Sequence, residues 1–163
     1  MPDVAAPGLR VLFCGINPGL YTAAIGHHFG RPGNRFWPAL HRSGFTPRQL
    51  APWEEDELLA LGLGITNLVA RTTAVATELS AAELREGGSQ LVARLEEYRP
   101  GWLAMLGLGS YRAAFGQPGA GLGPQPEALG PSRVWLLPNP SGLNAHYQLD
   151  ALATEFRRLR EAI

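Results

Sequence analysis

Short apolar runs alternate along this chain with longer segments that carry helical signals. The runs occupy residues 10–15, 64–69, 102–107 and 133–138, and each ends near a glycine, a proline or a polar loop. Strands that are apolar on both faces need cover on both faces, as in a parallel sheet packed between two layers of helices. The alternation therefore predicts an α/β fold, a three-layer sandwich with a mostly parallel central sheet flanked by helices.

Helix start signals stand between these runs. Asn34 is a suitable N-cap for a helix that ends at about Arg42. Ser80 and Glu83 form a capping-box signature that opens a helix to about Tyr98. Further helices are expected at 53–59, 110–115 and 148–162, and an ordered loop rich in glycine and proline at 116–131.

The chain has no internal repeat, no low-complexity segment and no dividing linker, so residues 1–163 are expected to form a single domain. No apolar run reaches the roughly 18 residues that a membrane span requires, so no membrane association is expected. The first residues lack a basic region followed by an apolar stretch, which argues against a signal peptide.

Several cofactor classes are excluded by residue type. Cys14 is the only cysteine, so an internal disulfide, a cysteine-built zinc site and an iron–sulfur cluster are ruled out. The histidines His27, His28, His41 and His146 form no HxxxH or HExxH pattern, so no metal and no other cofactor is expected. All 14 basic residues are arginine, which excludes a Schiff base on a lysine.

The net charge of zero argues by itself against a strongly basic nucleic-acid-binding protein. The charges are unevenly distributed, however: arginines dominate the first 50 residues, no Asp or Glu lies between Val4 and Pro52, and an acidic run follows at 54–57. A basic face with a remote acidic cluster and a surface of mixed charge are equally consistent with this distribution.

Two loops of unusual composition follow the first and last predicted strands: residues 15–20 (GINPGL) and 139–144 (NPSGLN). Ligands of open parallel sheets bind at the carboxyl ends of the strands, so these loops are expected to face each other across one cleft. Each is also a good turn sequence on steric grounds. The residues alone leave a plain turn and a functional loop equally open.

The first loop resembles the first motif of the mismatch-specific uracil-DNA and thymine-DNA glycosylase family, and the second loop resembles the second motif of its bacterial members. Segments at 26–29, 32–37, 64–73, 84–88 and 98–100 match family segments in the same order. The resemblance covers the chain from about Pro7 to the final helix. It implies the three-layer α/β fold of the uracil-DNA glycosylases.

The resemblance also implies an activity. A member of this family would be a monofunctional glycosylase that flips uracil out of double-stranded DNA containing a G:U or G:T mismatch and hydrolyses its N-glycosidic bond. Thymine and etheno-adducts are further candidate bases. The resemblance implies a monomer that initiates base excision repair in the bacterial cytoplasm, associated with the nucleoid through DNA.

Site residues follow from the same resemblance. Asn17 matches the residue that positions the attacking water, and an amide orients water better than it deprotonates it. The backbone N–H groups of Ile16 and Phe29 would hold the base carbonyls, and the Phe29 ring would stack on the flipped base. Thr22 matches a pocket wall residue, and Asn67 would offer its amide to the uracil edge or to the water.

In the second motif, Leu143 matches the wedge that enters the space left by the flipped base, and Gly142 would present its backbone to the orphan guanine. The motif positions expected to contact DNA are Asn139, Ser141, Gly142 and Leu143. The chain departs from the family at Ala145, where bacterial relatives often carry arginine, and His146 is the candidate substitute.

Two other functions remain open from the residues. A module that binds damaged or abasic DNA with little turnover would fit the neutral charge and the missing carboxylates. A small-molecule enzyme such as a nucleoside hydrolase would fit the sheet with glycine-rich loops, although a GxxxxGK phosphate loop is lacking. His27 and His28 are candidates for acid catalysis, for pocket lining or for phosphate contact.

Overall fold

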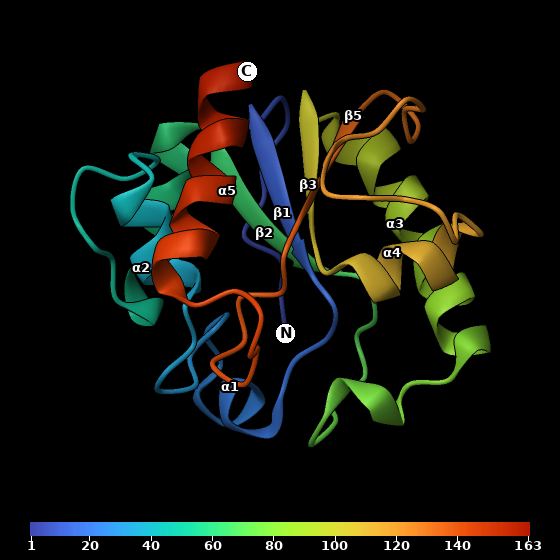
Figure 1. The fold of residues 1–163 in the computed structure, drawn as a ribbon, viewed down its shortest axis with the longest axis horizontal. Coiled ribbons are helices and arrows are strands. Elements are labelled where there is room, and N and C mark those ends of the chain that lie inside the picture. Colours follow the sequence, from blue (N-terminus) through green and yellow to red (C-terminus); the bar gives the residue numbers. More distant parts are fainter.

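Four parallel strands and one short antiparallel strand form the sheet at the centre of the computed structural model, which describes residues 1–163 (Figure 1). The sheet order is β2-β1-β3-β5-β4, and only β4 runs antiparallel to its neighbour. The strands are β1 (Val11–Gly15), β2 (Leu63–Asn67), β3 (Trp102–Leu106), β4 (Gly123–Pro124) and β5 (Arg133–Leu137). The predicted fold class, with its mostly parallel sheet, is confirmed.

Helices cover both faces of this sheet, because side chains alternate between two cores along each strand. Val11 and Phe13 point into one core, which α2 and α5 cover, and Leu12 and Cys14 point into the other, which α3 and α4 cover (Figure 1). The helical elements are α1 (Leu20–Ile25), α2 (Phe36–Arg42), η1 (Pro52–Leu61), η2 (Ala76–Glu78), α3 (Ala81–Tyr98), α4 (Leu108–Phe115) and α5 (Leu149–Ala162). No helix has both the length and the apolar character needed to cross a bilayer.

An aromatic cluster fixes β1 against the helices on one face. The Phe13 ring packs edge-on against Phe36 and Phe45, each with centroids 5.5 Å away, and stacks on Phe156 at 5.9 Å. Aromatic pairs of this kind contribute about 0.5–1.5 kcal/mol each beyond their burial. The strand from which the first loop leaves is therefore held against one core at Phe13.

Of the two predicted helix caps, that of α3 is confirmed and that of α2 is displaced by one residue. The N-cap of α2 is Arg35, which makes no side-chain capping bond, and the Asn34 side-chain oxygen, one residue earlier, accepts from the Phe36 N–H at 2.9 Å. Ser80 and Glu83 cap α3 reciprocally, with bonds of 3.1 and 3.2 Å. These local signals were readable in the sequence because the capping residue and its partner lie within three positions of each other.

Four elements differ from the prediction, and one of them is the unpredicted 3₁₀ turn η2. Residues 52–61 form a 3₁₀ rather than an α-helix; there Arg48 binds both Glu54 and Glu57, whose three-residue spacing matches the 3₁₀ repeat. The short strand β4 lies inside the predicted loop 116–131, on the sheet edge where a proline is tolerated. The unpredicted helix α1 has no side-chain cap and no acidic residue in its first turn, so it lacks start signals.

The strand order changes direction at β1. The chain passes from β1 to β2 on one side and then to β3 on the other side of β1. In open parallel sheets this switch point leaves a crevice at the carboxyl ends of the strands, where ligands bind. The loops that follow β1, β2 and β5 gather with α1 at this end of the sheet, at the bottom of Figure 1.

Candidate active site

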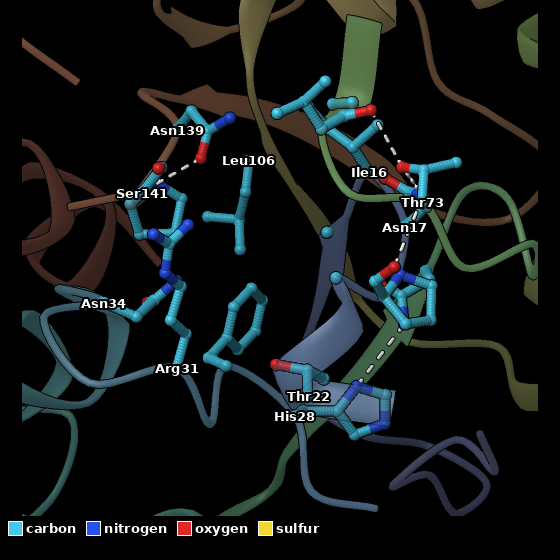
Figure 2. A pocket seen from close by; sticks show the side chains of 18 of the residues that line it. Ile16, Asn17, Thr22, His28, Arg31, Asn34, Thr73, Leu106, Asn139 and Ser141 are labelled. Atoms are coloured by element: carbon cyan, nitrogen blue, oxygen red, sulfur yellow. Dashed lines mark hydrogen bonds between the residues drawn. The ribbon is translucent and has the colours of Figure 1, made fainter. Parts of the chain in front are cut away.

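A cavity of about 220 Å³ lies at the switch point, between the two loops singled out in the sequence (Figure 2). The two loops therefore face each other across one cleft, as predicted. Of the predicted site residues, only Gly142 does not line this cavity, and it lines a smaller adjoining one instead. The predicted residues that line the main cavity are Ile16, Asn17, Thr22, Phe29, Asn67, Asn139, Ser141 and Leu143.

The Asn17 amide is held in one orientation by a loop far away in the sequence. Its nitrogen donates to the Thr73 hydroxyl at 2.8 Å (Figure 2) and to the Arg71 carbonyl, also at 2.8 Å. A carbonyl oxygen can only accept, so the nitrogen and oxygen of this amide cannot exchange places. The Asn17 Oδ1 atom accepts no hydrogen bond from the protein and is left as a free acceptor at the cavity.

Two backbone donors at the cavity are unpaired. The N–H groups of Ile16 and Phe29 donate to no other protein group, although both residues line the cavity.

Phe29 adopts a positive φ of 52°, which is unusual for an aromatic residue and is found where surrounding structure enforces it. Its ring stacks on that of Phe36 with centroids 4.1 Å apart, which fixes the ring against α2.

A side chain at position 15 would crowd two side chains that line the cavity. A Cβ atom on Gly15 would lie 2.8 Å from the Asn67 Oδ1 atom and 3.2 Å from the Phe29 ring. The last residue of β1 therefore lets the Asn67 amide, at the end of β2, and the Phe29 ring approach the same point. The sheet register pairs Gly15 with Asn67 directly.

His28 lies behind Asn67 and is almost completely buried. Its Nε2 atom is 2.9 Å from the Pro2 carbonyl, which can only accept, so Nε2 carries a proton. The Asn67 Nδ2 atom lies 3.4 Å from the other ring nitrogen, Nδ1 (Figure 2). This places the Asn67 Oδ1 atom on the Gly15 side of the amide.

The other histidine of this pair lies outside the cavity. The His27 Nδ1 atom is 3.4 Å from Glu55, and the second Glu55 oxygen accepts from the His28 N–H at 2.8 Å. Of the two candidate histidines, only His28 lines the cavity. Thr22 supports the same segment, because its hydroxyl accepts from the Gly30 N–H at 3.1 Å.

The charge around the cavity comes from one side chain. Arg31 is the only charged residue that lines it, and its guanidinium has no hydrogen bond or ion pair within the protein. The acidic run at 54–57 lies elsewhere and is partly neutralised: Arg48 binds Glu54 and Glu57 and holds the pKa of the Glu54 carboxyl below its usual range. No group of three or more histidine, cysteine or carboxylate side chains is gathered in the structure.

The second loop presents an apolar tip to solvent. The Asn139 side chain accepts from the Ser141 N–H at 2.9 Å, and the Ser141 hydroxyl accepts from the Leu143 N–H at 3.1 Å. These two successive turns leave the Leu143 side chain 70% exposed beside the cavity. His146 is exposed as well, and its ring makes no hydrogen bond within the protein.

Several cavity residues were not singled out in the sequence. Thr73 enters through a parallel bridge to Gly19, and Leu106 enters at the end of β3. Arg31 and Asn34 contribute from the segment between α1 and α2. Leu106 could have been predicted from its place at the end of a strand. Thr73 and Arg31 could not, because loop packing brings them to the cavity and leaves no local pattern in the sequence.

The model of the uracil DNA glycosylase superfamily matches residues 2–162 of the chain. The match includes both loops and every strand of the sheet.

Proposed function

The chain belongs to the uracil DNA glycosylase superfamily, whose members are DNA glycosylase hydrolases, and on that premise we propose that it is a mismatch-specific uracil-DNA glycosylase. In this proposal it flips uracil that is mispaired with guanine out of double-stranded DNA and hydrolyses the N-glycosidic bond. Thymine opposite guanine and etheno-adducts are further candidate substrates. The reaction is monofunctional and starts base excision repair.

The oriented Asn17 amide is the observation that carries this proposal. The amide nitrogen donates its hydrogen bonds to protein groups, whereas the Oδ1 atom accepts none, so this oxygen is available to a water molecule in the cavity. An amide is too weak a base to deprotonate that water in the ground state. Asn17 would therefore hold the water in line with the sugar carbon while the bond to the base breaks.

The departing base becomes negatively charged as the glycosidic bond breaks. Unpaired N–H donors at fixed positions stabilise such a charge without reorganisation, and Ile16 and Phe29 each supply one. The Phe29 ring would stack on the base, and the Asn67 amide would pair with its edge. The cavity of about 220 Å³ is smaller than the roughly 300–1,000 Å³ of pockets for drug-sized ligands, which suits a single flipped base.

The absence of lysine and of a carboxylate in the cavity defines the type of reaction. Without lysine, no side-chain Schiff base with the sugar forms, so strand cleavage should need added alkali. Without a carboxylate among the lining residues, no strong general base assists the water, and turnover should be slow. The exposed Leu143 would fill the space vacated by the base.

A gel assay tests the proposal. A labelled duplex with one U:G pair is incubated with excess enzyme and then treated with alkali, which cleaves the strand wherever a base has been removed. Wild-type protein should yield the cleaved strand only after alkali, and Asn17→Ala should lower the rate by roughly 10²–10³-fold, as for the loss of one key polar group. Absence of cleavage by stoichiometric wild-type protein would refute the activity.

A matched variant separates the role of Asn17 from a general effect of losing an amide. Gln117 is exposed, and its side chain makes no hydrogen bond in the protein. Gln117→Ala should therefore keep the wild-type rate on every substrate.

A panel of duplexes with U:G, T:G, U:A or etheno-cytosine, at equal enzyme concentration, would compare excision rates for different target bases. The U:G and U:A duplexes would show how strongly the rate depends on the opposite base.

A second candidate function is supported by the lack of any lining carboxylate. In that alternative the protein is a damage- or abasic-site-binding module with little turnover. It predicts tight binding to abasic DNA and excision by the wild type that does not exceed that of Asn17→Ala. The enzyme and the binding module are thus distinguished by the rate ratio of these two proteins.

A further inference from the structure

Arg35 makes an unusual set of contacts with the second loop. Its guanidinium has no carboxylate partner and donates instead to backbone carbonyls and one amide side chain. Its Nη1 atom donates to the carbonyls of Ser141 at 3.3 Å, Asn144 at 2.8 Å and Tyr147 at 2.8 Å; its Nη2 atom donates to the Gly142 carbonyl and the Gln148 Oε1 atom, both at 3.0 Å.

These contacts mean that the backbone of the loop curls around a cation. The four carbonyl dipoles converge on one point, and they would repel one another without the positive charge between them. The other hydrogen bonds of the segment join residues of the loop to one another, as between the Asn144 side chain and the Asn139 carbonyl. Arg35 is therefore the main polar link between this loop and the rest of the protein.

The opposite end of this link is anchored in the core. Arg35 immediately precedes α2, and the next two residues, Phe36 and Trp37, are buried among the core side chains. The Arg35 N–H also donates to the Pro140 carbonyl at 2.8 Å. The backbones of Gly33 and Gly142 pack so closely that a Cβ atom on Gly142 would lie 2.5 Å from the Gly33 carbonyl oxygen.

We infer that Arg35 is a positioning residue that holds the loop 140–148 in the conformation that presents Leu143 to the DNA stack. The inference rests on the proposed function, because it assigns Arg35 an effect on base flipping through Leu143. A flexible loop would lose conformational entropy each time the wedge entered DNA, whereas a loop already held by Arg35 does not. Arg35 itself need not touch the substrate.

Arginine suits this position better than lysine. The planar guanidinium carries two N–H donors on each of two terminal nitrogens in a fixed fork, and here Nη1 makes three side-chain contacts and Nη2 makes two. An ammonium group has only three donors, all on one nitrogen, whereas the contacts to Tyr147 and Gln148 come from two different nitrogens. Arg35→Lys should therefore retain the charge but only part of the activity, and Arg35→Met should lose more.

A double-mutant cycle with Leu143 tests the inference. Single-turnover excision from a U:G duplex is measured for wild type, Arg35→Met, Leu143→Ala and the double variant. Each single change should lower the rate about tenfold, the loss expected for about 1.4 kcal/mol of transition-state stabilisation. If Arg35 acts through Leu143, the double variant should be no slower than the slower single variant.

The cycle excludes a merely structural role. Losses that multiply in the double variant, or a wild-type rate for Arg35→Met, would overturn the inference. Arg157→Met is the matched control, since Arg157 also donates to a backbone carbonyl, that of Arg42, and makes no hydrogen bond to the loop. It should leave the rate unchanged.

Hydrogen exchange gives a second readout that does not depend on activity. In Arg35→Met, the amides of residues 142–147 should exchange faster in the free protein, while those of β1 and α3 stay protected. Unchanged exchange in the loop would overturn the inference even if activity fell. If wild-type protein released no uracil, the proposed function would fail. Faster exchange in the loop of Arg35→Met would then still show that Arg35 holds the loop 140–148 in place.

Discussion

The Asn17 amide nitrogen donates to the Thr73 hydroxyl at 2.8 Å, and this hydroxyl donates in turn to the Val75 carbonyl at 2.9 Å. The direction of both bonds is set by the final carbonyl, which can only accept. The free Asn17 Oδ1 atom thus owes its orientation to a residue of another loop. The bridge between Gly19 and Thr73 holds the two loops in this register.

Thr73→Val should impair the reaction without unfolding the protein. Valine has nearly the shape of threonine but cannot accept from Asn17, so the amide loses one of its two strong acceptors. We expect the single-turnover excision rate to fall about tenfold, equivalent to about 1.4 kcal/mol, with little change in DNA affinity. Rates measured at saturating enzyme, together with a binding isotherm, check both parts.

Thr73→Ser is the control for this prediction, because serine keeps the hydroxyl that accepts from Asn17. It should retain most of the wild-type rate. Equal rates for Thr73→Val and wild type would show that the Thr73 hydroxyl does not orient the amide.

Gly15→Ala should lower activity more than it lowers stability. The added Cβ atom would lie 2.8 Å from the Asn67 Oδ1 atom, so Asn67 must turn away and lose its contact with His28. The Asn67 amide can turn, and the Phe29 ring, 3.2 Å from the added atom, need shift only slightly, so we expect the free energy of unfolding to change by only about 1 kcal/mol. The excision rate should fall at least about tenfold.

Gly119 provides the matched control, since a Cβ atom there meets nothing within 4 Å and the residue lies in the loop after α4. Gly119→Ala should leave both the excision rate and the urea unfolding curve unchanged. A Gly15→Ala protein with full activity would mean that Asn67 can serve the reaction from another orientation.

Much of the fold was predictable because its signals are local. The apolar runs identify four of the five strands, and Ser80 with Glu83 identifies the start of α3. The positions of the loops after β1 and β5 then follow from strand order in a parallel sheet. Helix α1 and strand β4 escaped prediction because they are short and depend on tertiary contacts, such as that between Thr22 and Gly30.

The site was predictable only where a residue sits at the end of a strand or in a recognised motif. Asn17 and Asn67 meet both conditions. Arg35 reads locally as a surface residue beside a helix start, yet its hydrogen-bond acceptors lie more than 100 positions later in the chain. Thr73 was missed for the same reason, because its partner Asn17 is 56 positions away.

Arg31 should contribute to DNA affinity through a phosphate. It is the one charged side chain of the cavity and has no partner in the protein, so its charge is available to DNA. Each phosphate contact releases counterions, so Arg31→Gln should reduce the slope of log affinity against log salt by about 1. Binding of a U:G duplex, measured in the Asn17→Ala background at several salt concentrations, gives this slope with the substrate intact.

Arg10→Gln is the control for the salt slope. Arg10 also lacks an ion pair, but it immediately precedes β1 and so lies at the opposite end of the sheet from the cavity. Its loss should leave the slope unchanged. Equal slopes for wild type and Arg31→Gln would exclude a phosphate contact by Arg31.

The Cys14 thiol should make the protein lose stability at alkaline pH. Burial raises its pKa from 9.0 to about 12, because a thiolate would be desolvated in the core between β1 and the helices. The unfolded chain therefore releases this proton from about pH 9, while the native state retains it. The native state then binds more protons, so the free energy of unfolding falls as pH rises, by up to about 1.4 kcal/mol per pH unit.

Urea unfolding of wild type and Cys14→Ala between pH 8 and pH 10 measures this effect. Burial also raises the pKa values of Tyr98 and Tyr111 above their ordinary 10.0. The tyrosines therefore change the free energy of unfolding mainly at higher pH, and they do so equally in both proteins. Cys14→Ala should be less stable at pH 8 because it leaves a cavity. The difference in the free energy of unfolding between wild type and Cys14→Ala should narrow by about 1 kcal/mol by pH 10, since only wild type has a thiol that ionises on unfolding. A difference that stays constant with pH would mean that the native thiol ionises as it does in the unfolded chain.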